Sequence, residues 1–364
     1  MLEVAEILRR CVAAYRARHA LLPSQARALQ DIQQCRTAFF GGHVAQCDHC
    51  GHRRYAYHSC RNRHCPKCHG QQTRRWLEQH GQRMLPVPHY LLTFTLPSEL
   101  RSLCQAHPKP LYGLLLKSAA SSLLKLTRDP RYLGAQPAIL AVLHTWTRAL
   151  LYHPHAHLLV SAGGLDGERW VVPKNPAFLV PVRALSVIFR AKMREGLRRA
   201  GLLDQVPSRV WRSAWVVHCQ PAGSGRKVLE YLARYVFRVA ITNSRLEAFD
   251  QDQVTFRYRD NRTQQMRRVT LPALEFNGRF LRHTLPKGFA KVRAYGLASA
   301  SRRTACERLR RMLAGQTDVV TPASTPAPRP PATPSADSNT LCPHCRIGHW
   351  VVREILRPQR RFPP

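Results

Sequence analysis

The stretch from Leu151 to Gly164, LYHPHAHLLVSAGG, limits the possible folds more than any other part of this chain. It places His153, His155 and His157 at every second position and then continues into an apolar run. Side chains two residues apart in a β-strand point to the same face. We therefore expect a strand whose imidazoles share one face, and two neutral imidazoles at this spacing can bind one divalent cation. The alternative is an exposed strand whose histidines bind no metal.

A second stretch, residues 227–239 (KVLEYLARYVFRV), has apolar residues at helical spacing. Tyr231 and Tyr235 are four positions apart and therefore share one face of the predicted helix. Tyrosines at this spacing are usually core or interface residues. Together with a metal-binding His-x-His pair they indicate phosphoryl transfer to tyrosine, in which a metal ion polarises the scissile phosphate and a phenolate attacks it in line.

A third ligand for such a cation can come from the preceding predicted strand, residues 138–146. If the register of a hairpin with residues 149–162 brings His144 beside His155 and His157, His144 is the best candidate for that ligand. We favour His144 slightly over His153, because the proline that follows His153 disturbs the strand. The expected ion is Mg²⁺ or Mn²⁺.

The chain contains 12 cysteines, and two CxxC knuckles lie near its beginning. The loop between the knuckles has about fourteen residues, close to the usual interval of a four-cysteine zinc site. We therefore predict one structural Zn²⁺ ion bound by Cys47, Cys50, Cys65 and Cys68. The reserve ligands are Cys35, Cys60, His43 and His64. A further knuckle, Cys342–Cys345, has no second CxxC beside it, and a partial ribbon is as compatible with it as a complete site.

The charge of the chain predicts a polyanionic partner. The sequence has 57 Lys and Arg against 21 Asp and Glu, a formal net charge of +36 and a pI of about 11.0. Nucleic acid is the simplest such partner. Residues 1–22 are interrupted by charges and indicate an amphipathic helix rather than a signal peptide, and no apolar run approaches membrane-spanning length. We expect a cytoplasmic, nucleoid-associated protein, in which cysteines bind metal rather than form disulfides.

These blocks resemble the two-tyrosine HUH transposases of rolling-circle insertion sequences, the IS91-like group. The resemblance covers nearly all of residues 30–300. It rests on five segments in the family's order: CRTAFFGGHVAQCDHCG, YHSCRNRHCPKC, LHTWTRALLYHPHAH, EYLARYV and LPKGFAKVRAYG. It implies a metal-dependent enzyme that nicks and rejoins single-stranded DNA at element ends through 5′-phosphotyrosine links to Tyr231 or Tyr235. It also implies that the zinc module recognises those ends.

The order of predicted elements indicates an α+β fold with a mainly antiparallel sheet. Strands are expected at 90–96, 138–146 and 149–162, and one helix is expected from 97 to about 126. The resemblance implies an HUH endonuclease-type central sheet with flanking helices, preceded by a small helical and zinc-ribbon module. The expected division is a zinc-binding module at 1–85, the catalytic domain at 86–245, its basic extension at 246–316, a linker at 317–340 and a tail at 341–364.

Three other functions share part of this pattern. A rolling-circle replication initiator or relaxase uses the same metal and tyrosine chemistry. A zinc-ribbon DNA-binding protein without catalysis explains the charge and cysteines but leaves the histidines and tyrosines unused. A metal phosphodiesterase uses water as the nucleophile and forms no covalent adduct.

Overall fold

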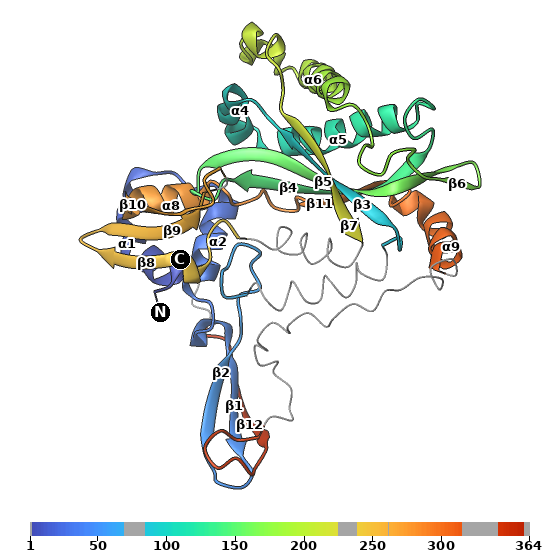
Figure 1. Ribbon diagram of the computed structural model, residues 1–364. Coiled ribbons are helices and arrows are strands. Elements are labelled where there is room, and N and C mark those ends of the chain that lie inside the picture. Colours follow the sequence, from blue (N-terminus) through green and yellow to red (C-terminus); the bar gives the residue numbers. More distant parts are fainter. Residues whose placement is uncertain (1, 69–83, 225–238, 261, 315–340, 360–364) are drawn as a thin grey trace.

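An antiparallel sheet forms the centre of the molecule, as the computed structural model shows (Figure 1). The structure describes residues 2–68, 84–224, 239–260, 262–314 and 341–359. The strand order is β11-β4-β5-β3-β7, and β6 pairs with β5 beyond this path. The strand bounds are β3 Pro88–Thr95, β4 Gln136–Trp146, β5 Tyr152–Asp166, β6 Arg169–Val171, β7 Val217–Ser224 and β11 Val292–Gly296. The predicted α+β class with antiparallel sheets and flanking helices is confirmed.

The two faces of this sheet have different neighbours. The helices α4 (Arg101–Ala106), α5 (Pro108–Thr127) and α6 (Val182–Arg199) cover one face (Figure 1). Phe94 of β3 points to this side, and its ring lies 5.0 Å from that of Phe189 in α6. Ala156 pairs with Phe94 across the strands, so His155 and His157, its neighbours in sequence, point to the opposite face.

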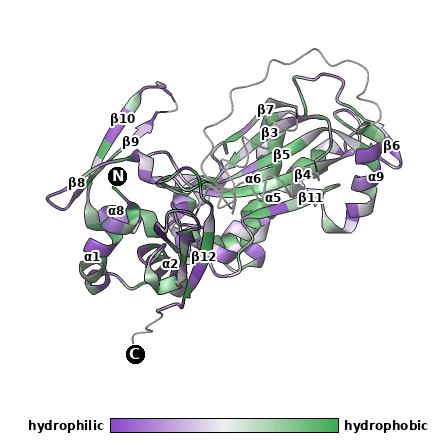
Figure 2. Cartoon of the chain, turned by 90° about the horizontal axis from the view of Figure 1, so that it is seen from below, coloured by the Kyte–Doolittle hydropathy of each residue, from purple (hydrophilic) through white to green (hydrophobic). Residues whose placement is uncertain are grey.

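Burial of apolar side chains stabilises the central sheet and its helices. Figure 2 shows hydrophobic residues concentrated in the strands of the central sheet. Phe94, Leu158 and Phe189 are fully buried in one continuous core. Each such side chain contributes roughly 1.5–3 kcal/mol through burial. The helix predicted from 97 to about 126 is interrupted, because His107 adopts a non-helical conformation before Pro108 begins α5.

A second core lies beside the sheet. It contains α1 (Val4–Arg18), α2 (Pro23–Gln33), α8 (Ala273–Leu281) and the small sheet β10-β9-β8. The strands of this small sheet are β8 Leu246–Asp250, β9 Gln253–Arg259 and β10 Met266–Pro272. Val4 of α1 donates its backbone N–H to Asn243 Oδ1 at 3.1 Å. The helices near the start of the chain therefore pack on segments that the predicted division places after the catalytic domain.

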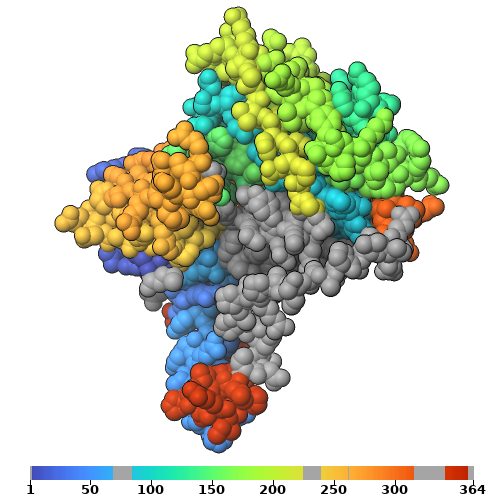
Figure 3. Space-filling view, in the orientation of Figure 1, coloured from blue at the N-terminus to red at the C-terminus, as the bar shows by residue number. Residues whose placement is uncertain are grey.

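A narrow three-stranded arm projects from these two cores (Figure 1). Its strand order is β12-β1-β2, with β1 Gly42–Cys47 in the middle, β2 Arg53–Tyr57 on one side and β12 Trp350–Leu356 on the other. In the space-filling view, residues after 341 lie against the hairpin at the tip of the arm (Figure 3). Residues 341–359, predicted as part of a separate tail, thus complete the sheet of the first module.

The remaining helix, α9 (Arg303–Ala314), packs Leu309 and Leu313 against Leu85 and Leu297. Among the described residues, no helix has the length and apolar composition needed to cross a membrane.

Candidate functional site

Three histidines converge on the sheet face opposite the helices. The antiparallel register of β4 and β5 places His144 directly across from His155, and His157 lies two positions further along β5. The ring of His144 lies 5.3 Å from that of His155 and 4.7 Å from that of His157. One nitrogen of each histidine lies within 4.8 Å of the other two. Three imidazole nitrogens in this arrangement can bind one divalent cation from one side and leave positions open on the other.

Hydrogen bonds fix the orientation of two of these rings. His155 Nδ1 lies 2.7 Å from the backbone carbonyl oxygen of His153, to which it donates, so its Nε2 keeps a free lone pair. His157 Nδ1 lies 3.1 Å from the Thr93 hydroxyl on β3. His144 stacks on Trp146, with ring centres 5.1 Å apart. Supports of this kind hold metal-binding imidazoles in one tautomer and orientation.

The protonation states also suit a cation. Burial lowers the pKa of His155 to about 4, and burial with the neighbouring His155 lowers the pKa of His157 to about 3. Both rings are therefore neutral at pH 7, the form that binds metal. A half-buried pair of neutral imidazoles with the buried ring of His144 beside it fits a divalent cation.

His153 was the rival for the third position, and the structure gives it another partner. Its Nδ1 lies 3.1 Å from the guanidinium of Arg101, which donates to it. Its nitrogens lie outside the set of mutually close nitrogens formed by the other three histidines. Metal binding by His144 stays a prediction, but the geometry favours it over His153.

Tyr231 and Tyr235 lie outside the described residues. Their predicted roles as nucleophiles therefore stay predictions, and the structure places neither side chain.

Basic groups line the same end of the sheet. The Lys291 ammonium nitrogen lies 4.8 Å from the ring centre of Trp146, and its charge acts on His155 and His157. Burial, with Arg63 nearby, lowers the pKa of Lys291 to about 7. An anion bound beside Lys291 would raise that pKa again and favour its charged form. In the sequence, Lys291 lies in the segment LPKGFAKVRAYG, where nothing distinguishes it from the other basic residues.

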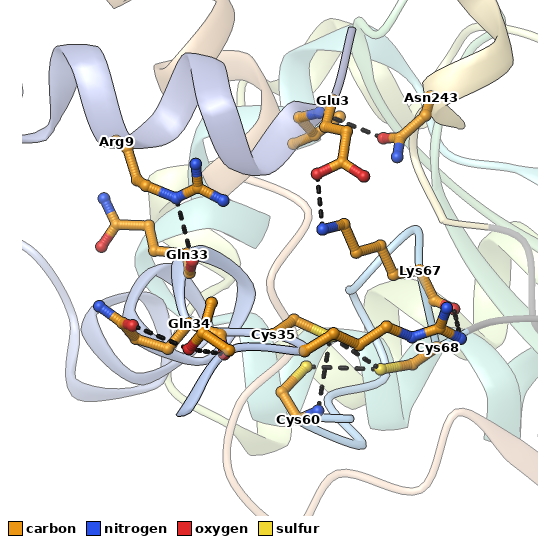
Figure 4. Close-up of polar contacts among 12 residues, drawn as sticks. Glu3, Arg9, Gln33, Gln34, Cys35, Cys60, Lys67, Cys68 and Asn243 are labelled. Carbon is orange, nitrogen blue, oxygen red and sulfur yellow. Dashed lines mark hydrogen bonds and ion pairs between the residues drawn. The ribbon is translucent and has the colours of Figure 1, made fainter. Parts of the chain in front are cut away.

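The first cysteine cluster differs from the predicted one. Cys65 and Cys68 gather with Cys35 and Cys60, not with Cys47 and Cys50. The Sγ atom of Cys68 lies 3.5 Å from those of Cys35 and Cys60 (Figure 4). A zinc–sulfur bond of about 2.3 Å in a tetrahedral site implies sulfurs roughly 3.8 Å apart, so these four thiols need little movement to bind one Zn²⁺ ion.

The predicted set fails because the hairpin separates its halves. Cys47 ends β1 and Cys50 lies in the turn that follows, at the tip of the arm, whereas Cys65 and Cys68 lie at its base. Five residues at about 3.3 Å per residue put the tip more than 15 Å from the base. Cys47 and Cys50 instead gather with Cys342 and Cys345.

The first cluster is tied to both cores. Lys67 forms an ion pair of 2.5 Å with Glu3, and Asn62 donates to Asp31 at 2.9 Å (Figure 4 shows the former). On the other side, Arg63 donates to the carbonyl oxygen of Phe289 at 2.8 Å.

A neighbouring contact uses a neutral histidine. The backbone N–H of Leu285 donates to His64 Nε2 at 3.2 Å, and burial lowers the pKa of His64 to about 3, so this ring can accept. The loop at 60–68 therefore connects the zinc-binding cysteines to the segment 285–291, which ends at Lys291.

The sequence offered an incomplete signal for these groups. Cys35 and Cys60 were reserve ligands without a CxxC partner, and the second cluster needs residues from distant parts of the chain. Thr93 lies in none of the quoted segments, and the segment that contains Trp146 gives no sign of its role, so the strand register was needed to find both.

Two family models match the chain. The model described as "Transposase zinc-binding domain" matches residues 7–96, and the model described as "Putative transposase" matches residues 138–305. The first range contains all four cysteines of the first cluster, and the second contains the three histidines. No solved structure matches.

Two curated relatives extend this result over most of the chain. The chain is 38% identical to "Putative transposase y4qJ" of Sinorhizobium fredii, over 97% of this chain and 95% of that protein. It is 30% identical to "Transposase for insertion sequence element IS801" of Pseudomonas savastanoi pv. phaseolicola, over 72% of this chain and 67% of that protein.

Proposed function

Because the chain belongs to the IS91-like family of insertion-sequence transposases with an N-terminal zinc-binding domain, we propose that it nicks and rejoins single-stranded DNA at the ends of its element. The reaction proceeds through 5′-phosphotyrosine intermediates and serves rolling-circle transposition. The observation that carries this proposal is the cluster of buried His144 with half-buried His155 and His157 on the sheet face opposite the helices.

The histidines hold the reaction centre. His155 and His157 are neutral at pH 7 and, with His144, would bind Mg²⁺ or Mn²⁺. The ion would supply charge stabilisation at the phosphate. Thr93 and the carbonyl group of His153 keep two of the rings in position, so the donor atoms are arranged before DNA arrives.

The chemical step conserves the phosphodiester bond energy. The phenol oxygen of Tyr231 or Tyr235 attacks the phosphorus, the bond to the 3′ oxygen breaks, and the proton lost by the phenol is balanced by the proton gained by the 3′ hydroxyl. Rejoining reverses the step with a 3′ hydroxyl as the attacking group. Two tyrosines allow one DNA end to stay linked while a second strand is cut.

Positive charge guides the substrate. The net charge of +36 attracts a polyanion, and Lys291 provides a half-buried cation beside the histidines for a phosphate. Arg63 and His64 join the zinc-binding loop to the segment that carries Lys291. The zinc module can thereby hold recognised DNA in a fixed relation to the cutting site.

A covalent-adduct assay tests the proposal. The protein is incubated with labelled single strands that span the ends of its element, with Mg²⁺ or Mn²⁺, and separated on denaturing gels. We expect a labelled protein band that requires the ion and disappears in the double variant Tyr231→Phe and Tyr235→Phe. Tyr132→Phe, in a turn after α5, is a matched control that keeps the band.

Two results would contradict the proposal in different ways. Cleavage without an adduct would indicate water as the nucleophile. DNA binding without cleavage, under both ions and at both ends, would indicate a zinc-dependent DNA-binding protein without catalysis.

A further inference from the structure

The second cysteine cluster lies at the tip of the arm, far from the histidines (Figure 1). We propose that Cys47, Cys50, Cys342 and Cys345 bind a second structural Zn²⁺ ion, which fastens the segment 341–359 to the β1–β2 hairpin. The chain then holds two structural zinc ions, one at the base of the arm and one at its tip. This inference stands independently of the proposed DNA chemistry.

The sulfur positions match a tetrahedral zinc site. The Sγ atoms of Cys47 and Cys345 lie 3.6 Å apart, and those of Cys50 and Cys342 lie 3.8 Å apart. All four sulfurs lie within 4.8 Å of one another. Tetrahedral Zn–S bonds of about 2.3 Å require sulfur separations of roughly 3.8 Å. Cys50 and Cys342 are 292 positions apart in sequence, so folding alone brings these thiols together.

The two knuckles share one backbone hydrogen bond. In the first, the N–H of Gly51 donates to the carbonyl oxygen of Cys47 at 3.1 Å, and in the second the N–H of Arg346 donates to the carbonyl oxygen of Cys342 at 2.7 Å. Each knuckle is followed at once by a residue with positive φ, Gly51 at 74° and Arg346 at 60°. Such turns direct backbone N–H groups at the sulfurs: the N–H of Cys50 donates to Cys47 Sγ at 3.5 Å, and the N–H of Gly348 donates to Cys345 Sγ at 3.4 Å.

Backbone contacts hold the knuckles face to face. Asp48 donates its N–H to the carbonyl oxygen of His349 at 3.0 Å, and His349 donates its N–H to Asp48 Oδ1 at 2.7 Å. Gly348 permits this approach, because a Cβ atom there would lie 2.5 Å from both Cys47 Sγ and Asp48 Oδ1. A glycine at which any added side chain would displace its neighbours thus lies directly against a proposed ligand.

The arm also needs a metal for its stability. Every residue of β12 is exposed or half-buried, and the same holds for β2, so β1 is the only strand of the arm with a buried side. Ile355 is 77% exposed and Val352 is 56% exposed. A small sheet without an apolar core is marginal in water, and a bound zinc ion supplies the missing free energy of folding.

Metal counting on the full-length protein tests the inference. Zinc per chain is measured by elemental mass spectrometry after gel filtration, and Co²⁺ replacement reports the ligands by absorption. We expect two ions in the unmodified chain and one in Cys345→Ser. Cys345→His should regain the second ion with a shifted cobalt spectrum, because zinc accepts three cysteines and one histidine. Cys306→Ser, a half-buried cysteine in α9, is the matched control and should keep two ions.

A reciprocal variant separates ligation from misfolding. Cys60→Ser should lose the ion at the base and keep the one at the tip, since the two clusters share no ligand. Equal zinc content in Cys345→Ser and the unmodified chain would overturn the inference. Failure of Cys345→His to bind more zinc than Cys345→Ser would overturn it as well, whatever the stability of the serine variant.

Discussion

The central sheet and the arm are both antiparallel, but different forces hold them together. In the sheet, Phe94, Leu158 and Phe189 belong to a continuous buried core beneath three helices. In the arm, β2 and β12 bury almost nothing, and eight cysteines at its base and tip gather into two groups of four. The comparison teaches that apolar burial stabilises the part that carries the histidines, whereas metal ligation stabilises the part that precedes and follows it in sequence.

Metal removal should produce the largest difference between the two regions, measured as loss of hydrogen-exchange protection. A strong chelator should increase hydrogen exchange at amides of β1, β2 and β12 by at least about a hundredfold, because binding of structural zinc is folding free energy. Amides of β3, β4 and β5 should keep their protection. Exchange followed by mass spectrometry measures both regions in one sample, and equal loss of protection in the two sheets would break the comparison.

Truncation of a large apolar side chain should destabilise the central sheet much more than the arm. Phe94→Ala removes a fully buried ring in contact with Phe189 and should cost about 3–5 kcal/mol of unfolding free energy without change in zinc content. Its counterpart in the arm, Val352→Ala, should cost less than about 0.5 kcal/mol, because that side chain is exposed. Denaturant unfolding measures both, and a large cost at Val352 would show that the arm has an apolar core.

Gly348→Ala should weaken the tip site alone. The added methyl group meets Cys47 Sγ and Asp48 Oδ1, so one of the two knuckles must shift. We therefore expect the zinc ion at the tip to be released about tenfold faster, and the ion at the base to be released at an unchanged rate. Release into a chromophoric chelator measures the rate. Gly113→Ala in α5 serves as the control, because its methyl group meets only Arg293 at an ordinary distance of 3.7 Å.

The smallest expected effect is that of mildly acidic pH on cation binding by the histidine cluster. An imidazole with the ordinary pKa of about 6.5 is about nine-tenths protonated at pH 5.5, so two such ligands would lose about a hundredfold in cation affinity. The lowered pKa values of His155 and His157, about 4 and about 3, keep both rings neutral at that pH. Protonation of these two rings should therefore lower Mn²⁺ affinity by less than about twofold between pH 7.5 and 5.5, and a drop of about a hundredfold would contradict the burial argument.

Protonation of His155 and His157 should also lower the folding stability as the pH falls. The pKa values of His155 and His157 are lower in the folded chain than in the unfolded chain, so the unfolded chain takes up more protons. Their contribution is fully present above about pH 6.5 and declines as the pH falls through the two folded pKa values, about 4 and about 3.

Local patterns in the sequence predicted the sheet well. The strands expected at 90–96, 138–146 and 149–162 correspond to β3, β4 and β5, because alternation and β-branched residues are local signals. The hairpin of β4 and β5 was expected, but its register, which places His144 across from His155, comes from the structure. The uninterrupted helix to about 126 was wrong, because the break before Pro108 was not taken into account.

The cysteine pairing could not be predicted from spacing. A CxxC knuckle is half of a zinc site, and its spacing contains no information about the other half. The nearest knuckles in sequence, Cys47–Cys50 and Cys65–Cys68, lie at opposite ends of a hairpin, and the partner of the first is Cys342–Cys345. Only the pairing of β1 with β12 reveals this arrangement.

Mn²⁺ binding to zinc-replete protein, followed by electron paramagnetic resonance, tests the histidine cluster most directly. The geometry predicts one bound ion, an affinity lower by at least about tenfold in His144→Asn, and an affinity within about twofold of the unmodified chain in His153→Asn, whose ring faces Arg101. Unchanged binding in His144→Asn together with loss in His153→Asn would contradict the account and assign the third position to His153.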